Sequence, residues 1–187
     1  MLEESLLQLR RPARYLGNEW NVVRKDFDKQ KLKFAICFPD LYEIGMSHLG
    51  LRIIYGLLNS QEGVVCERVF LPDLDMQQVL RSRAVPLYSL ESQRPLREFD
   101  FIGFCLNYEL NYTNILAILD LAGIPFKSQD RPSGLPLVIA GGTCTANPSR
   151  KRLACKDNLC SGQPLLQMGE GYPRSFQKCG RDRTYDK

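Results

Sequence analysis

The chain has 187 residues, of which 44% are hydrophobic and 25% charged, as expected of a globular protein with one domain or one domain plus appendages. No apolar run reaches the ~18 residues of a membrane span, and the acidic start lacks the basic and then apolar pattern of a secretory signal, so we expect a cytoplasmic protein. The net charge of the chain is +4, but residues 150–187 carry nine basic and four acidic side chains. Residues 1–149 therefore have a net charge of −1, which favours neither nucleic acid nor anionic membrane as a partner.

The first thirty residues are mixed in character. We interpret residues 1–30 as an N-terminal extension, with a loop over 14–21 that packs on the main domain. The first strong strand is predicted at Lys33–Phe38. It is almost continuously apolar, which is typical of a central parallel strand covered on both faces.

A loop that contains Gly45 follows this strand and leads to a helix over 48–59, for which Ser47 is the expected N-cap. The next predicted elements are a strand at Val64–Phe70, a helix over 74–83, an extended piece at Pro86–Leu90, a strand at Asp100–Leu106, a helix from Asn111 or Thr113 to Ala122, and a strand at Leu137–Ala140.

Apolar strands that alternate with amphipathic helices predict an open parallel α/β sheet with helices on both faces, over residues 31–149. Ligands of such sheets bind beyond the carboxyl ends of the strands. Three loops occupy that position, at residues 39–50, 107–114 and 141–148.

Polar side chains and glycines in these loops are the candidate ligand-binding groups. His48, the only histidine, either binds a cofactor or transfers a proton, or packs at the start of its helix. The pair Gly141-Gly142 allows either close approach of a ligand or a tight turn. The polar candidates, which equally well cap helices and solvate loops, are Asp40, Glu43, Asn107, Glu109 and Asn114.

Several sequence patterns of catalysis and cofactor binding are absent. Neither a G-x-G-x-x-G motif after a strand nor a P-loop motif occurs. Cys144, Cys155 and Cys160 match neither C-x3-C-x2-C nor a paired C-x2-C zinc pattern. We therefore assign no catalytic residue and no metal ligand. The odd number of cysteines, seven, with Cys37 and Cys105 inside apolar runs, favours free thiols in a reducing compartment.

The pattern of elements breaks after Ser149. Residues 150–187 are basic, hold three cysteines and show no sustained apolar periodicity. Three interpretations stay open, namely a disordered basic tail, a shifted or wrongly assembled reading frame, and a zinc-binding appendage.

Five segments together resemble a bacterial family of B12-binding-domain radical SAM proteins, in order over roughly residues 10–149. The segments are Pro12–Glu19, Phe38–Leu51, Pro86–Ser92, Phe104–Asn114, and Val138–Gly142 with Asn147-Pro148. The resemblance implies a cobalamin-binding-like domain of flavodoxin-like order. In that family a radical SAM barrel follows, which holds a [4Fe–4S] cluster on C-x3-C-x2-C and cleaves S-adenosylmethionine.

The resemblance implies that the loops at Asp40–Leu51, Asn107–Asn114 and Gly141-Gly142 face a corrinoid or its nucleotide tail. The cobalamin motif D-x-H-x-x-G is absent in strict form, because Ser47-His48-Leu49-Gly50 places a glycine two residues after the histidine and has no matching aspartate. Ser47, His48 and Gly50 are nevertheless candidate cofactor-binding residues.

The chain also departs from the family after residue 149, which suggests truncation or a frameshift and the loss of the last strand. We then expect Leu137–Ala140 to form an edge that recruits other chains. The leading hypothesis is the N-terminal cobalamin-binding-like fragment of a radical SAM protein, inactive without its barrel. The alternatives are a vestigial α/β interaction domain that binds no cofactor, and a Rossmann-type transferase.

Overall fold

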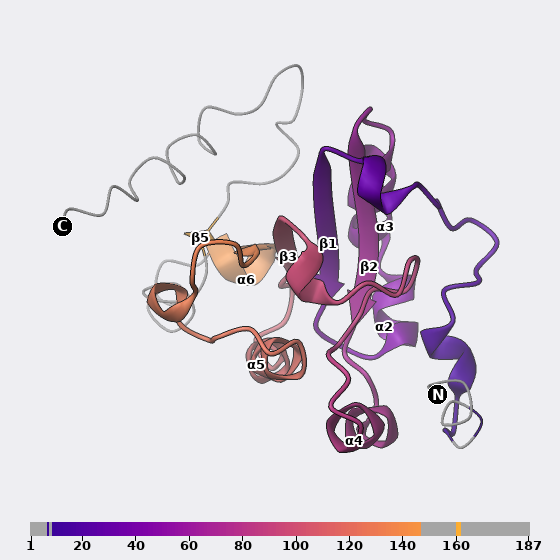
Figure 1. The fold of residues 1–187 in the computed structure, drawn as a ribbon, viewed down its shortest axis with the longest axis vertical. Helices are drawn as coiled ribbons and strands as arrows, with labels where there is room; N and C mark the ends of the chain where they lie inside the picture. The colour runs from indigo at the N-terminus through magenta and orange to yellow at the C-terminus, as the bar shows by residue number, and fades with distance from the viewer. Residues whose placement is uncertain (1–6, 8, 147–159, 162–187) are drawn as a thin grey trace.

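A computed structural model describes residues 7, 9–146 and 160–161, which build one open, all-parallel sheet (Figure 1). Its strands are β1 (Leu32–Phe38), β2 (Val64–Phe70), β3 (Phe101–Cys105), β4 (Leu137–Gly141) and the two-residue β5 (Cys160–Ser161). Their order across the sheet is β2-β1-β3-β4-β5. The predicted open parallel α/β sheet with flavodoxin-like order is therefore confirmed.

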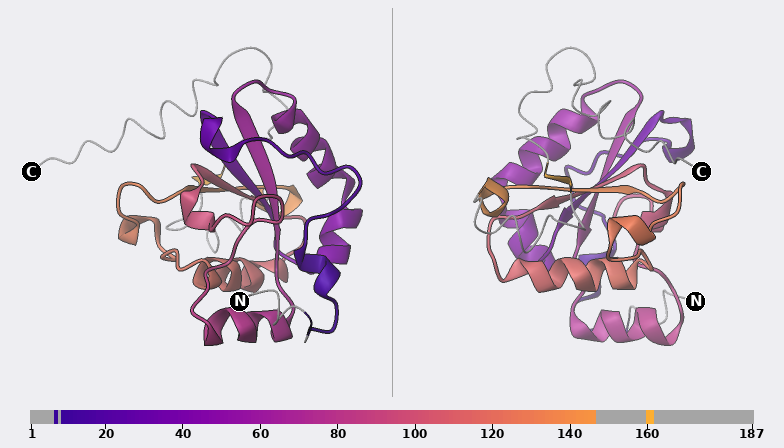
Figure 2. Two further views of the ribbon diagram at one scale, coloured as in Figure 1. Left: turned by 45° about the vertical axis from the view of Figure 1, so that its right-hand side comes forward. Right: turned by 90° about the vertical axis from the view of Figure 1, so that its left-hand side faces the viewer.

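Helices cover both faces of the sheet, as Figure 2 shows, with α4 and α5 on one side and α3 on the other. Leu51 of α3 belongs to the same core as Ile36 of β1, whereas Ile118 of α5 shares the opposite core with Ile102 of β3. The α-helices are α2 (Tyr42–Ser47), α3 (Leu49–Asn59), α4 (Leu74–Ser82), α5 (Asn111–Leu121) and α6 (Thr143–Ala146), and the 3₁₀ helices are Pro12–Tyr15, Phe27–Lys29, Leu96–Glu98 and Ser128–Asp130.

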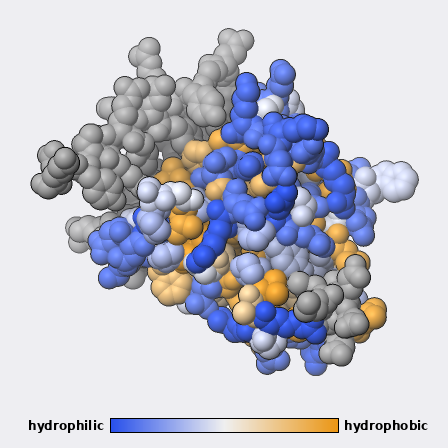
Figure 3. Space-filling model, viewed as in Figure 1, coloured by the Kyte–Doolittle hydropathy of each residue, from blue (hydrophilic) through white to orange (hydrophobic). Residues whose placement is uncertain are grey.

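The exposed surface agrees with a core placed on both sides of the sheet. On the face drawn in Figure 3, hydrophilic side chains predominate and hydrophobic ones lie in small groups between them. None of the helices in the described part of the chain has the length and apolarity needed to cross a membrane.

The predicted elements agree with the structure to within one or two residues, but two short α-helices, α2 and α6, lie in segments that were predicted to be loops. The loop expected after the first strand contains the short helix α2, Tyr42–Ser47. Six residues are fewer than two helical turns, too few for a recognisable apolar period. The predicted tail, residues 150–187, lies outside the described residues apart from β5, which pairs opposite Ile139 and Ala140 of β4.

Residues 11–24, here called the strap, lie against the loops that follow β1 and β2. Arg14 is buried and donates from Nε to Glu43 of α2 at 2.8 Å and from Nη1 to Asp73, the N-cap of α4, at 2.9 Å. Gly17 has a φ of +59°, and a Cβ atom there would collide with the Leu90 carbonyl oxygen. The strap therefore fixes two neighbouring loops relative to each other.

Side chains also occupy the outer edge of β2, beside which the described residues place no further strand. Lys25 Nζ donates to the Val64 carbonyl at 2.6 Å. The side-chain amide of Asn59 donates to the Cys66 carbonyl at 2.9 Å and accepts from the Cys66 N–H at 3.1 Å. These bonds satisfy backbone groups that would otherwise be open to pairing with another chain.

Candidate functional site

The three predicted ligand loops meet where the strand order reverses, between the carboxyl ends of β1 and β3. Nε2 of His48 lies 2.8 Å from Nδ2 of Asn107 across this point. Asn114 Nδ2 donates to the Pro39 carbonyl at 2.9 Å, and Thr143 Oγ1 donates to the Asn107 carbonyl at 3.3 Å. We call the assembled edge the rim, made of residues 39–51, 107–114 and 141–145.

His48 is the N-cap of α3. Its Nδ1 accepts a hydrogen bond from the Leu51 N–H at 3.1 Å, and its ring packs on Phe38 with the ring centroids 5.1 Å apart. The prediction that Ser47 caps this helix is wrong. Ser47 ends α2, and its hydroxyl donates to the Ile44 carbonyl at 2.7 Å, so the imidazole one residue later takes the free N–H of α3.

Three glycines of the rim differ in what a side chain would meet at their positions. A Cβ atom on Gly50 would lie 2.9 Å from Cε1 of His48, so this glycine leaves room for the ring. Gly142 has a φ of +123°, and a Cβ there would collide with the Leu106 carbonyl oxygen. A Cβ on Gly141 would meet no atom of the described part of the chain within 4 Å. The chain's own backbone requires Gly142, whereas Gly141 has an open side.

Two of the three acidic candidates of the rim, Asp40 and Glu43, have their carboxylates bonded within the chain. Oδ1 of Asp40 accepts from the Leu41 N–H at 2.8 Å. Glu43 accepts from Arg11 and Arg14, both at 2.8 Å. Partial burial acts to raise the pKa of Glu43, but the hydrogen bonds from Arg14 and Arg11 outweigh it and lower the pKa to about 2. Both carboxylates hold loops in place.

The rim exposes both polar and large apolar side chains. Glu109 is exposed on the turn before α5, where its carbonyl accepts from the Tyr112 N–H at 3.2 Å. Three large apolar residues of the rim, Leu49, Tyr108 and Leu110, are 67%, 55% and 69% exposed. Exposed apolar groups that polar residues surround mark surfaces that contact other proteins.

A small cavity lies near the carboxyl end of β2, where Tyr42 of α2 lines one part of it. It has a volume of about 20 Å³, and Arg14, Tyr42, Phe70 and Tyr88 are among the residues that line it. A space of this size holds about one water molecule. It is far too small for a corrin ring.

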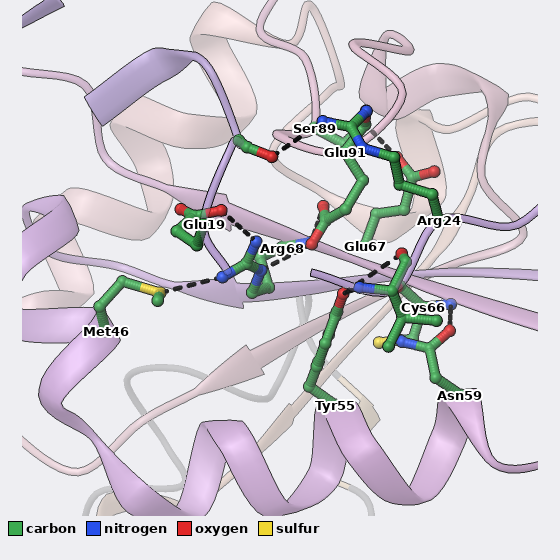
Figure 4. A network of polar contacts seen from close by, with 12 residues as sticks. Glu19, Arg24, Met46, Tyr55, Asn59, Cys66, Glu67, Arg68, Ser89 and Glu91 are labelled. Carbon is green, nitrogen blue, oxygen red and sulfur yellow. Dashed lines mark hydrogen bonds and ion pairs between the residues drawn. The ribbon is translucent and has the colours of Figure 1, made fainter. Parts of the chain in front are cut away.

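A buried ionic network, drawn in Figure 4, was not predicted. Arg68 on β2 is 5% exposed, and it binds Glu91 at 2.6 Å and Glu19 of the strap at 2.8 Å. Its Nη1 also lies 3.1 Å from Met46 Sδ. Burial acts to lower the pKa of Arg68, but Glu91 and Glu19 outweigh it and raise the pKa. Burial also raises the pKa of Glu91, against the effect of Arg68.

The same network completes the outer edge of β2. Oε2 of Glu91 accepts from the Arg68 N–H at 2.8 Å, and the Leu90 N–H donates to the Arg68 carbonyl at 3.0 Å. Glu67 is 1% exposed and accepts from the hydroxyl of Ser89 at 2.5 Å. The adjacent charges Glu67-Arg68 inside an otherwise apolar strand were the sequence signal for this network.

The described cysteines do not fit an iron–sulfur cluster. Cys37, Cys66, Cys105 and Cys144 are buried and free, and the described residues contain no group of three or more metal-binding side chains. Burial raises the pKa of Cys37 and Cys66 well above the usual value, and that of Cys105 to about 11. These thiols stay protonated, whereas cluster ligands are thiolates.

The fold and the rim can be set beside known protein families. The family model described as radical SAM proteins, N-terminal, matches residues 50–155, which run from the start of α3 past β4. No curated protein and no solved structure matches the chain. The matched segment covers more than half of the 187 residues, and we conclude that the chain belongs to the N-terminal family of radical SAM proteins.

Proposed function

We propose that this chain is a docking domain of a radical SAM protein, and that its rim contacts the domain that cleaves S-adenosylmethionine. The observation that carries the proposal is the rim itself. Several of its polar side chains are bonded within the chain, as in the pair His48 and Asn107, while Leu49, Tyr108 and Leu110 are exposed. A surface of this kind favours a protein partner over a small polar ligand.

Family membership implies S-adenosylmethionine and an iron–sulfur cluster in the intact protein. The buried, protonated thiols of Cys37, Cys66 and Cys105 support a division of labour, in which the cluster is held outside the described residues. The role of this domain would then be to hold and shield the catalytic domain.

The test is a binding experiment between this chain and a separately produced radical SAM catalytic domain of the same family. Leu49→Ser together with Leu110→Ser should weaken the association at least tenfold by sedimentation or calorimetry. Leu57→Ser is the matched control, because Leu57 is 50% exposed at the far end of α3. No association by the folded chain, or an equal loss in the control, would refute the proposal.

A corrinoid at the same rim is a second candidate. Its support is the resemblance of the loops and the open side of Gly141, where a ligand could approach the backbone. Titration with hydroxocobalamin tests it. Saturable binding that Gly141→Leu weakens would support a corrinoid, and a folded sample that does not bind would leave docking as the whole function.

A further inference from the structure

We propose that His48 is a positioning residue, which closes the rim by joining the β1 loop to the β3 loop, and that it does not serve as the lower ligand of a cobalt ion. This inference rests on the proposed function and deepens it. It specifies that the rim is assembled by the chain alone, before any partner or cofactor arrives.

The first step is the position of the ring on α3. His48 has the extended backbone of an N-cap, with φ −80° and ψ 108°, and its Nδ1 accepts from the Leu51 N–H at 3.1 Å. No acidic residue occupies the first turn of α3, so the imidazole lone pair serves a helix end without other side-chain support. The neutral ring then carries its proton on Nε2.

The second step is the other ring nitrogen. Nε2 of His48 lies 2.8 Å from Nδ2 of Asn107. An exchange of the two ends of this amide turns its oxygen to the Nε2–H and gives up only the long bond, 3.4 Å, from the Thr143 N–H to Oδ1. The Asn107 carbonyl accepts from Thr143 Oγ1 at 3.3 Å, so the contact reaches the loop after β4. Both nitrogens of the ring therefore have partners within the chain.

The third step is the space around the ring. One side packs on Phe38, with 5.1 Å between the ring centroids, and Cε1 lies where a Cβ of residue 50 would be, at 2.9 Å. Gly50, which makes this segment resemble a cobalamin motif, is thus needed by the imidazole itself. Cobalt ligation requires a free nitrogen lone pair, and a turn of the ring to offer one would give up the cap of α3.

The test uses the fact that His48 is the only histidine of the chain. His48→Asn keeps a capping side chain without an imidazole, whereas His48→Ala removes the cap. We expect His48→Ala to lower the folding equilibrium constant roughly tenfold and His48→Asn to change it by less than about threefold, measured by urea unfolding. An equal loss in both variants would contradict the inference.

A second measurement does not depend on variant stability. In the chain labelled with ¹⁵N-histidine, NMR should show a single imidazole with its proton on Nε2, unchanged by excess hydroxocobalamin. A ring signal that shifts or broadens on addition, together with an absorption change that is lost in His48→Asn, would overturn the inference. Docking to the catalytic domain is measured separately, with the Leu49→Ser and Leu110→Ser variant against its Leu57→Ser control, so either proposal can fail without the other.

Discussion

The two outer strands of the sheet are secured in different ways. On β2, the backbone groups of Val64, Cys66 and Arg68 are bonded by Lys25, Asn59 and Glu91. On β4, the described part of the chain offers the outer edge only the two-residue β5. One edge is protected by side chains from well-separated positions, and the other depends on residues that follow β4.

This difference shows that an edge can be protected without a further strand. Charged and amide side chains bond the backbone groups of β2 that a further strand would otherwise bond. This prevents the addition of another chain. At β4 the expectation of self-association stays a prediction, to be measured by sedimentation. The variants below test how far the two sides differ.

The largest effect is expected from Glu91→Ala on the β2 side. The change leaves Arg68 buried without its closest partner, 2.6 Å away, and should cost about 3–5 kcal/mol of unfolding free energy in urea. Glu98→Ala is the control, since Glu98 is exposed and bonded to Arg94 at 3.1 Å. A loss below about 1 kcal/mol from Glu91→Ala would show that the network contributes little.

The next effect concerns two adjacent glycines on the β4 side. Gly142→Ala should cost about 2–3 kcal/mol, because φ is +123° and the new methyl group meets the Leu106 carbonyl. Gly141→Ala should be nearly neutral, because its Cβ enters open space. Thermal and urea unfolding of the two variants give the comparison, and equal costs would contradict it.

Asn59→Ala should open the β2 edge. It removes both bonds to the Cys66 backbone and should cost about 2 kcal/mol. It should also increase self-association in sedimentation, because an N–H and a carbonyl become available to another chain. Ser60→Ala, on the exposed neighbour, is the control. Unchanged association would mean that this edge needs no capping.

A smaller effect is expected from pH at the strap. The pKa of Glu43 is about 2 in the folded chain, below its usual 4.5, so its contribution is present above about pH 4.5 and is lost as the pH falls through 2. Because its side chain is 45% exposed, we expect less than ~1 kcal/mol. The stability gap between wild type and Glu43→Gln should narrow from pH 5 to pH 2, and a gap that widens would refute this.

The smallest effect is expected at Trp20, which is fully exposed on the strap and is the only tryptophan. Trp20→Ala should change the unfolding free energy by less than about 0.5 kcal/mol. Its fluorescence should be that of indole in water, and acrylamide should quench it readily. A blue-shifted emission would show that the strap is held by apolar burial as well as by its polar anchors.

The sequence was sufficient for elements that depend on local pattern. The run Val64–Phe70 was placed to the residue, although the charged pair Glu67-Arg68 interrupts its apolar residues. The meeting of three loops followed from the geometry of parallel sheets. The Arg68 network was out of reach, because Glu19 and Glu91 lie 49 and 23 residues away from Arg68 in the chain. The sequence also did not reveal that His48, and not Ser47, is the N-cap of α3, because histidine is not among the preferred N-cap residues.

The strap has a consequence for how the protein is made. A ribosome delivers Gly17 and Glu19 early, but the groups that receive them, Leu90 and Arg68 with Glu91, are synthesised much later. Until residue 91 has emerged from the ribosome, Gly17 and Glu19 cannot make all of these contacts. We therefore expect these first-made residues to be among the last to reach their final position, open meanwhile to proteases and chaperones.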